Sequence, residues 1–276
     1  MGRNRSEGWQ YAKITGHLNE EDVAELLKKD LQFQKDFLRK IKKTDRKIEN
    51  VEVGGKNEKN VECILGGKTK SKSDLKIFLD DDSKYGISIK KSLGGQVFLI
   101  GVERFIKGFE KQYEKKISNN VKEAISLFWG TSPKVKEIIS EYTVNKEYEL
   151  KKNRLVSKTL LSYDSGLYNE LLKWFSENIQ EITDFCFSRG LAKNKEDYAN
   201  YIWYSKEKGE NIFSLKELQN AVSTSEVTYG IKNFGTTIQL PFGFVQWHSP
   251  KKIIPGQIQF HHNYKKITKL LNKDRI

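Results

Sequence analysis

Apolar and polar residues alternate at every second position on both sides of a turn-rich segment, DDDSKYG, which lies within residues 75–90. Such alternation around a turn predicts a β-hairpin. Folding the hairpin about Asp82 sets Asp74 opposite Lys90. Because side chains alternate between the two faces of a strand, Asp74, Ser88 and Lys90 are expected to share one face, and the apolar residues are expected to share the other.

The remaining chain shows helical spacing over much of its length. Apolar residues recur at intervals of three or four over about residues 105–129, 134–142, 165–188 and 196–206, which predicts helices there. A further helix is expected to begin after Asn19, a residue type that favours the N-cap position.

Other stretches predict strands and connections. A short strand is predicted near residues 48–53, and the continuous apolar run 96–102 predicts a strand buried on both faces. The lysine-rich segment 145–158 is expected to be a connection. Residues 223–258 contain three of the chain's four prolines among Thr, Val, Tyr and Gln, which predicts strands and long loops. The aromatic residues crowded between 174 and 204 are expected to pack in a core.

The chain has 276 residues, enough for one large domain or two modest ones. With 37% hydrophobic and 12% aromatic residues it can build a packed core, which argues against wholesale disorder. Lys and Arg number 49 against 36 Asp and Glu, giving a formal net charge of +13. This excess favours a polyanionic partner, most simply nucleic acid, through counterion release. A generally lysine-rich proteome would produce the same excess without such a partner.

The cysteine content and the hydropathy of the chain predict the cellular compartment of the protein. Cys63 and Cys186 are far apart and show no metal-ligand spacing, so reduced, buried thiols are expected. No apolar run approaches the length of a membrane span, and the N-terminal segment lacks the apolar core of a signal peptide. A cytoplasmic protein without a membrane partner is therefore expected.

The predicted hairpin carries residue types suited to phosphodiester hydrolysis. This reaction needs a metal ion that polarises the phosphate and activates a water, and a cation that faces the developing negative charge. Asp74 is a suitable Mg²⁺ ligand, the main-chain carbonyl of Ile89 is a candidate second ligand, and Lys90 is the candidate cation. Ser88 would bind through a metal-bound water, and Glu20 is the candidate for an additional carboxylate at the metal.

Each of these assignments has a purely structural alternative. An aspartate and a lysine on one face of a hairpin also occur as an ordinary surface ion pair. Glu20, Glu21 and Asp22 would lie in the first turn of the helix after Asn19, where the helix dipole favours acidic residues. The residue pattern alone leaves both interpretations open.

Three segments carry a resemblance to a known family. GGKTKSKSD, which ends at Asp74, is followed by ISIKKS around Lys90 and then by an apolar strand. The late segment FGTTIQLPFGFVQWHSPKK and the opening helix that contains Glu20 extend the match. Together they resemble the type II restriction endonucleases of the PD-(D/E)xK superfamily, and among them the MspI-like group. Ser73 stands where the superfamily has proline, and Ser88 stands where it has an acid or an amide.

The resemblance implies a mixed α/β fold with a central mixed β-sheet flanked by helices, in a single restriction-endonuclease-like domain covering residues 1–276. Its catalytic core would span about residues 1–130, a helical insertion about 131–222, and a DNA-reading region of strands and loops about 223–262. The resemblance also implies Mg²⁺-dependent hydrolysis of both strands of double-stranded DNA at a short specific sequence. The expected protein is a monomer or homodimer, paired in function with a cognate DNA methyltransferase.

Donor and acceptor side chains in the basic segments are the expected DNA contacts. Readout of base edges is assigned to the late polar residues, and contacts near the phosphate backbone are assigned to residues around the hairpin. The predicted DNA-binding residues are Lys68, Lys70, Lys72, Lys91, Gln96, Lys232, Asn233, Gln246, His248, Lys251, Lys252, Gln257 and Gln259. Two alternatives remain open: a structure-directed repair or recombination nuclease of the same fold, and a non-catalytic DNA-binding protein.

Overall fold

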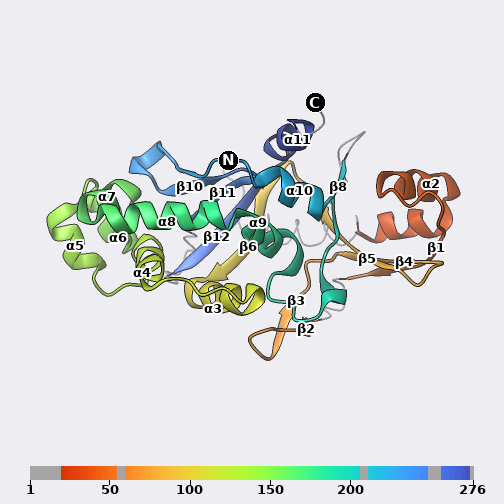
Figure 1. The fold of residues 1–276 in the computed structure, drawn as a ribbon, viewed down its shortest axis with the longest axis horizontal. Helices are drawn as coiled ribbons and strands as arrows, with labels where there is room; N and C mark the ends of the chain where they lie inside the picture. Colours follow the sequence, from red (N-terminus) through yellow and green to blue (C-terminus); the bar gives the residue numbers. More distant parts are fainter. Residues whose placement is uncertain (1–19, 55–59, 206–210, 248–255, 274–276) are drawn as a thin grey trace, which may run out of the picture. The chain divides into compact units, whose positions relative to one another are not determined.

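The chain divides into two compact units, each with its own five-stranded sheet (Figure 1). The computed structural model describes residues 20–54, 60–205, 211–247 and 256–273. The first unit comprises Met1–Leu93 and Phe187–Glu217, and the second comprises Gly94–Cys186 and Leu218–Ile276. The grouping of the whole chain into one domain stays a prediction.

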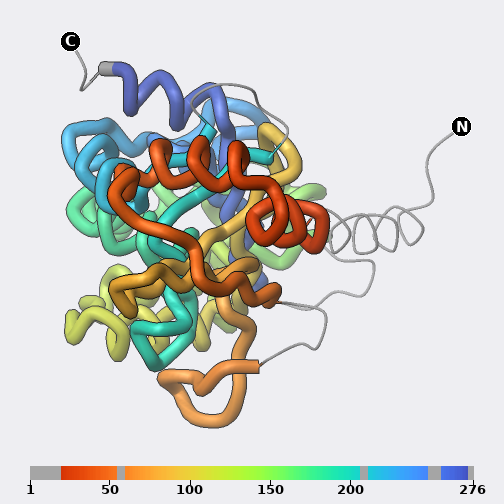
Figure 2. The backbone as a smooth tube through the Cα atoms, turned by 90° about the vertical axis from the view of Figure 1, so that its right-hand side faces the viewer, coloured from red at the N-terminus to blue at the C-terminus, as the bar shows by residue number. Residues whose placement is uncertain are grey.

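The first unit is built on a mixed sheet with the strand order β1-β4-β5-β7-β8. The pair β5–β7 is parallel, and the other neighbours are antiparallel. The strands are β1 (Ile48–Val53), β4 (Leu75–Leu79), β5 (Lys84–Lys90), β7 (Tyr201–Tyr204) and β8 (Ile212–Ser214). A short hairpin of β2 (Asn60–Glu62) and β3 (Lys68–Lys70) projects from this unit (Figure 2).

Two helices cover one face of this mixed sheet (red in Figure 1). Residues 20–29 form the first helix, and α2 (Leu31–Lys40) follows it. Asp30 separates them and caps α2, because its side chain accepts hydrogen bonds from main-chain N–H groups of the first turn. The buried apolar residues of the helices and sheet form one cluster: Val23, Ala24, Leu27, Phe37, Leu38, Ile41, Val51, Leu75, Ile77, Leu79, Ile87, Ile89, Trp203 and Ile212.

The second unit is built on an antiparallel sheet with the strand order β6-β12-β11-β10-β9. The strands are β6 (Gly94–Gly101), β9 (Thr228–Tyr229), β10 (Thr237–Leu240), β11 (Gly243–Trp247) and β12 (Gln257–Asn263). Three of them lie wholly within the segment 223–262, and β12 ends one residue beyond it. The predicted strand-rich character of this segment is therefore confirmed.

Most of the helices follow β6 in the sequence. They are α3 (Val102–Tyr113), α4 (Asn119–Phe128), α5 (Val135–Tyr142), α6 (Lys146–Lys152), α7 (Ser157–Tyr163), α8 (Ser165–Glu177), α9 (Ile179–Asp184), α10 (Leu215–Val222) and α11 (Tyr264–Lys273). The mixed α/β class, with a mixed sheet flanked by helices, is thereby confirmed.

Aromatic side chains form the centre of the second unit's core. The ring centroid of Phe105 lies 6.0 Å from that of Trp174 and 5.8 Å from that of Phe185, both edge-on, and 5.7 Å from that of Phe260. All four side chains are buried. Edge-to-face aromatic pairs add about 0.5–1.5 kcal/mol beyond the burial of their area. The expectation that crowded aromatic residues pack in a core is confirmed here.

Three local predictions are wrong. The strand β6 forms at the run 96–102, but Ile100 is the only one of its residues that is buried, so the strand is not buried on both faces. The predicted helix 196–206 is instead a 3-10 turn, Lys195–Asp197, followed by β7. Strand β7 is buried along most of its length, and a short apolar run does not distinguish a buried strand from a helix. The segment 145–158, predicted as a connection, contains α6 and the start of α7. Asn145 is the N-cap of α6, because its side chain accepts a hydrogen bond from the main-chain N–H of Tyr148.

Gly86 of β5 packs closely against the chain that follows the 3-10 turn. A Cβ atom at this position would lie 2.1 Å from the main-chain oxygen of Tyr198 and 2.9 Å from Oγ of Ser73. The main-chain oxygen of Tyr198 can move away from the added Cβ atom only if the backbone around Tyr198 or β5 itself shifts. We therefore expect Gly86→Ala to lower the free energy of unfolding by about 2–4 kcal/mol. Chemical denaturation measures this change. Lys84→Ala, at an exposed position of the same strand, should cost less than about 1 kcal/mol. Equal midpoints of chemical denaturation for wild type and Gly86→Ala would contradict the prediction.

Candidate active site

The β4–β5 hairpin places the predicted catalytic side chains on one face of the sheet. Leu75 pairs with Ile87, so Asp74, one residue before Leu75, lies opposite Ser88. The predicted pairing of Asp74 with Lys90 is therefore wrong by two residues. A displacement of two residues leaves every side chain on its own face, and Lys90 remains a diagonal neighbour of Asp74.

The turn explains the difference in pairing. The N–H of Leu79 donates to the main-chain oxygen of Ser83 at 3.0 Å, which leaves a loop of three residues. Asp82, the last of these, adopts a left-handed conformation with φ of 61°. Three-residue hairpin loops commonly end in a residue of this conformation. The hairpin consequently folds about Asp81 and not about Asp82.

A chain of hydrogen bonds joins the three side chains. The main-chain N–H of Ile89 donates to Oδ2 of Asp74 at 2.6 Å. The Ser88 hydroxyl donates to the same oxygen at 3.4 Å, and Oγ of Ser88 accepts from Nζ of Lys90 at 2.7 Å. Ser88 is 1% exposed. Its hydroxyl therefore links the ammonium group to the carboxylate out of contact with bulk water.

Burial opposes the charge of both Asp74 and Lys90. It raises the pKa of the Asp74 carboxyl, whereas the Lys90 charge, the Ile89 N–H and the Ser88 hydroxyl lower it. Burial also lowers the pKa of the Lys90 ammonium group, and the negative charges of Asp74 and Glu20 act in the other direction. On balance the pKa of Asp74 is raised and the pKa of Lys90 is lowered, so the neighbouring groups offset only part of the effect of burial. Perturbed pKa values of this kind occur at functional sites and in structural ion-pair networks.

Glu20 adds a second carboxyl group to these electrostatics. Burial raises its pKa to about 7, and the negative charge of Asp74 contributes to the rise. Lys91 and Lys90 lower the pKa, and Nζ of Lys91 lies 3.8 Å from Oε1 of Glu20. Glu20 is the first described residue of the helix 20–29, while Asn19, its predicted N-cap, lies outside the described residues.

The donor set suits a hard divalent cation such as Mg²⁺. Such ions prefer oxygen ligands, and Mg²⁺ commonly takes one or two carboxylates and keeps several waters. Within the described part of the chain, the protein hydrogen bonds to Asp74 end on Oδ2, so Oδ1 is available to a ligand. Ile89 directs its N–H toward Asp74, and its C=O points to the same edge of the strand. These groups and Glu20 are the residues that would hold the ion.

The site contains only a small number of charged ligands. Among the described residues, no group of three or more His, Cys, Asp or Glu side chains is arranged to hold a metal. Any ion at Asp74 would consequently depend on main-chain oxygen and water as well as on the two carboxylates.

The other predicted DNA-binding residues are distributed over both units. In the first unit, Lys68 and Lys70 are exposed on β3, and Lys72 and Lys91 are half-buried. In the second unit, Gln96, Gln246, Gln257 and Gln259 lie on β6, β11 and β12, and Lys232 and Asn233 are exposed between β9 and β10. His248, Lys251 and Lys252 lie outside the described residues.

Three predicted glutamines form a hydrogen-bonded row across the second sheet. Nε2 of Gln259 donates to Oε1 of Gln96 at 2.7 Å, and Nε2 of Gln246 donates to Oε1 of Gln259 at 2.9 Å. We call these residues the amide row. His261 lies beside it, with its Nε2 3.2 Å from Nε2 of Gln246, and its ring stacks on Phe244 with 4.4 Å between centroids. The prediction omitted His261 and Phe244, although their positions, two residues from Gln259 and Gln246, place them on the same face.

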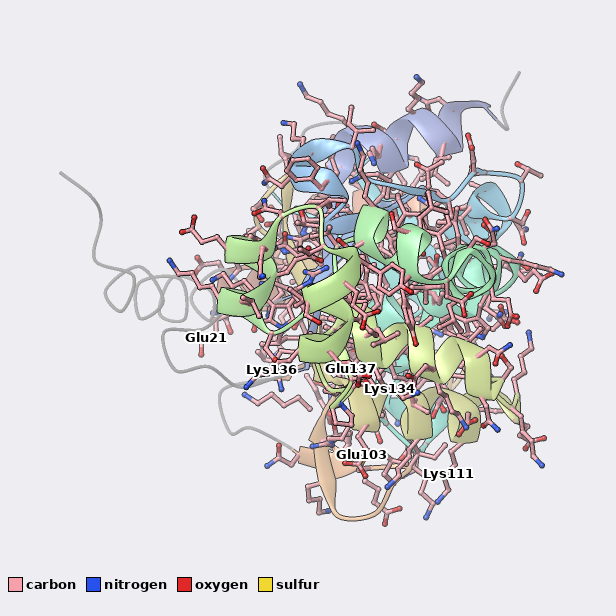
Figure 3. The ribbon with its side chains drawn as sticks, turned by 90° about the vertical axis from the view of Figure 1, so that its left-hand side faces the viewer. Glu21, Glu103, Lys111, Lys134, Lys136 and Glu137 are labelled. Carbon is pink, nitrogen blue, oxygen red and sulfur yellow. The ribbon has the colours of Figure 1, made fainter. Side chains whose placement is uncertain are left out.

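The helical face of the second unit carries charges of both signs. Figure 3 labels Glu103 and Lys111 on α3, Lys134 at the N-cap of α5, and Glu137 on α5. Nζ of Lys107 lies 2.6 Å from Oε1 of Glu103, and Lys134 pairs with an acid of α4. A mixed surface of paired charges does not favour a polyanion, so this face is a poor candidate for contact with DNA.

Similarity to known proteins is found among solved structures. No family model and no curated protein matches the sequence. Among solved structures, the chain is similar to the restriction endonuclease MspI in complex with its cognate DNA. The match covers 83% of this chain and 77% of the other at 12% sequence identity, with a TM-score of 0.44. Within the described residues, none of the helices is both long enough and apolar enough to span a membrane.

The raised pKa of Glu20 predicts a pH-dependent stability in the absence of divalent cations. Its folded-state pKa of about 7 exceeds the ordinary value of 4.5, so the folded protein binds an additional proton between these values. The free energy of unfolding should therefore fall as the pH rises from about 4.5 to 7. Glu20→Gln removes this loss, and at pH 8 it should be more stable than wild type by about 2–3 kcal/mol.

Denaturant titrations of both proteins at several pH values measure this difference. Glu25→Gln is the control on the same helix, because Glu25 is exposed and its pKa is lowered by Lys29. Parallel stability curves for wild type and Glu20→Gln across this pH range would show that Glu20 is not held in a raised-pKa environment.

Proposed function

We propose that this protein is a Mg²⁺-dependent nuclease that hydrolyses phosphodiester bonds in double-stranded DNA. The observation that carries the proposal is the hydrogen-bonded chain Asp74–Ser88–Lys90 on one face of the β4–β5 hairpin, with Ile89 and Glu20 completing an oxygen-rich site. In its more specific form, the proposal is a type II restriction endonuclease that cuts at a short sequence. It would act in the cytoplasm as a monomer or homodimer beside a cognate DNA methyltransferase.

The residues of the site have separate tasks in this reaction. The bound ion would polarise the phosphate and lower the pKa of the attacking water. The Ile89 N–H fixes the Asp74 carboxylate, which would hold the ion. Lys90 supplies a positive charge to the phosphate as negative charge develops, and its lowered pKa favours proton exchange with the attacking water. Water adds its hydroxyl to phosphorus, the bond to the leaving oxygen breaks, and that oxygen takes up a proton.

Charge and polar groups outside the site favour DNA as the substrate. The net charge of +13 attracts a polyanion, and the exposed Lys68 and Lys70 project on the β2–β3 hairpin, where they would contact phosphates. Gln259 is buried at the centre of the amide row, whereas Gln96 is exposed and Gln246 is half-buried. Their amides are the chemistry that reads adenine edges in the major groove. We propose that this row and its neighbour Gln257 contribute sequence readout.

One observation favours a second candidate, a DNA-binding protein without catalytic activity. Ser88 occupies the position where a second acid would face the ion, and its hydroxyl is engaged by both Lys90 and Asp74. A site with this lower negative charge has a lower affinity for divalent cations. In that case the hairpin would serve as scaffold.

Incubation with a long DNA of known sequence tests the catalytic proposal. We expect discrete fragments with Mg²⁺ and intact DNA with EDTA. Asp74→Ala and Lys90→Ala should each lower the cleavage rate by about a hundredfold or more, because each removes a charged group that faces the phosphate or its ion. Asp82→Asn is the matched control: it neutralises an exposed acid in the same hairpin, and asparagine tolerates the left-handed conformation.

The products distinguish the alternatives. Mg²⁺-dependent smearing that requires Asp74 would replace restriction by structure-directed or nonspecific cleavage. DNA that is retarded on a gel but never cut would support the binding protein and contradict the catalytic roles of Asp74 and Lys90.

The amide row and the projecting hairpin should give different binding signatures. Gln246→Leu should relax discrimination between related sites by about 10-fold to 100-fold, because it removes an amide that would pair with a base edge. Lys70→Gln should weaken binding to all sequences alike and reduce the slope of log K against log salt by about one. Fluorescence anisotropy with a pool of related duplexes, repeated at several salt concentrations, measures both effects. Identical changes in the two variants would contradict the separation of readout from phosphate contact.

A further inference from the structure

The connection between β9 and β10 presents an apolar side chain almost entirely to solvent. We call residues 230–235, with the sequence GIKNFG, the tip loop. Ile231 of this loop is 93% exposed, more than any other large hydrophobic residue among the described residues, and Phe234 is 42% exposed. An isoleucine in this position makes no contribution to a core. A single exposed apolar side chain is ordinary in itself, so its significance depends on the conformation and the charges of the loop that carries it.

The tip loop is held in a fixed and unusual conformation. Asn233 and Phe234 have φ values of 49° and 59°, and Gly235 continues the left-handed stretch with φ of 86°. Left-handed backbone is costly for an aromatic residue such as Phe234, and such strain is concentrated at functional sites. The strain therefore indicates that the loop's shape is itself under constraint.

Hydrogen bonds fix the loop at its base and along its side. The N–H of Gly230 donates to the oxygen of Thr237 at 2.8 Å. The N–H of Ser157 donates to the oxygen of Gly235 at 2.9 Å, and the Ser157 hydroxyl donates to the oxygen of Phe234 at 3.4 Å. Because these bonds join the loop to α7 as well as to the sheet, Ile231 extends from a rigid support and would lose little conformational entropy on contact with a partner.

The charges around the tip loop match a nucleic acid. The loop contains no acidic residue, and its Lys232 is exposed next to Ile231. A second cation, Nζ of Lys158, lies 5.7 Å from the centroid of the Phe234 ring. Asn233 adds a donor and an acceptor of the kind that reads the minor groove. A protein partner would need an interface of about 1,000 Å² or more, for which one isoleucine and a half-exposed phenylalanine offer too little apolar area.

We propose that Ile231 is a wedge that enters between stacked base pairs of bound duplex DNA, while Lys232 and Lys158 contact the flanking phosphates. Apolar side chains inserted in this way unstack a base step and kink the duplex, and the cations beside them supply the binding energy. This inference rests on the proposed function, because it assigns a distorted duplex as the form of DNA that the protein holds.

Permanganate footprinting tests the wedge without knowledge of the recognition sequence, because permanganate oxidises thymines that have lost their stacking. The full-length protein is bound to a long DNA with Ca²⁺ in place of Mg²⁺, at concentrations that gel retardation shows to be saturating. We expect wild type to produce reactive thymines at its bound sites. Ile231→Ala should abolish this reactivity while still retarding the DNA, and Ile231→Leu should retain it.

Two further variants distinguish the wedge from general effects. Leu31→Ala removes another highly exposed aliphatic side chain, 71% exposed on α2, and should leave the footprint unchanged. Lys232→Gln should reduce the salt dependence of binding but keep the reactive thymines.

The outcomes separate this inference from the proposed function. Reactive thymines of equal intensity in wild type and Ile231→Ala, or none in a wild-type protein that binds and cuts DNA, would overturn the wedge and leave the nuclease in place. Failure of wild type to retard DNA at low salt would overturn the proposed function and the wedge together.

Discussion

The geometry of the candidate site depends on the hydrogen bond that the main-chain N–H of Ile89 donates to the Asp74 carboxylate at 2.6 Å. Asp74 precedes β4 by one residue, and its own N–H donates to the main-chain oxygen of Ile87 at 2.8 Å. Both of these contacts come from β5, the strand that also carries Ser88 and Lys90. Because β5 lies at the centre of the mixed sheet, between β4 and β7, a single well-supported strand determines where Asp74 and Lys90 lie.

The site also depends on a balance of charge under partial burial. Burial alone would neutralise Asp74 and Glu20 by raising their pKa values and would neutralise Lys90 by lowering its pKa. Two lysines, Lys90 and Lys91, act on the two carboxyl groups in the other direction and offset part of this effect. Loss of either Asp74 or Lys90 would leave the other's buried charge uncompensated, which is more costly than the loss of both. A bound cation would relieve the repulsion between the carboxylates and free the lysines to face a phosphate.

Sequence patterns determined the faces of the hairpin but not its pairing. Period-two alternation assigned Asp74, Ser88 and Lys90 to one face, because that assignment is insensitive to a displacement of two residues. The pairing itself depends on whether the turn contains three residues, and this in turn depends on the left-handed conformation of Asp82, which no apolar pattern encodes. The strand β7 was missed for a related reason, since its four residues YIWY are mostly buried and have no alternation to detect.

The amide row shows a second limit of prediction from the sequence. Each glutamine was predicted as a DNA contact on its own, yet the hydrogen bonds among them require that β6, β11 and β12 be neighbours in one sheet. Gln96 and Gln259 are separated by more than half of the chain, and a strand pairing over that distance leaves no local trace. Spacing along each strand places His261 on the face of Gln259 and Phe244 on the face of Gln246, but the pairing of β11 with β12 is what joins the two pairs in one surface.

Both burial and the charges of the neighbouring groups constrain which residue can occupy position 88. Its position is almost fully buried and lies directly opposite Asp74. A carboxylate there would add a third acid against two lysines, and burial would raise the pKa of at least one of the three groups further. Lys90 would then pair directly with that acid. A serine avoids both results, because its hydroxyl accepts from Lys90 and donates to Asp74 without adding charge. The consequence is a weaker attraction for cations, which is why the carboxyl group of Glu20, on a separate helix, matters to any chemistry at this hairpin.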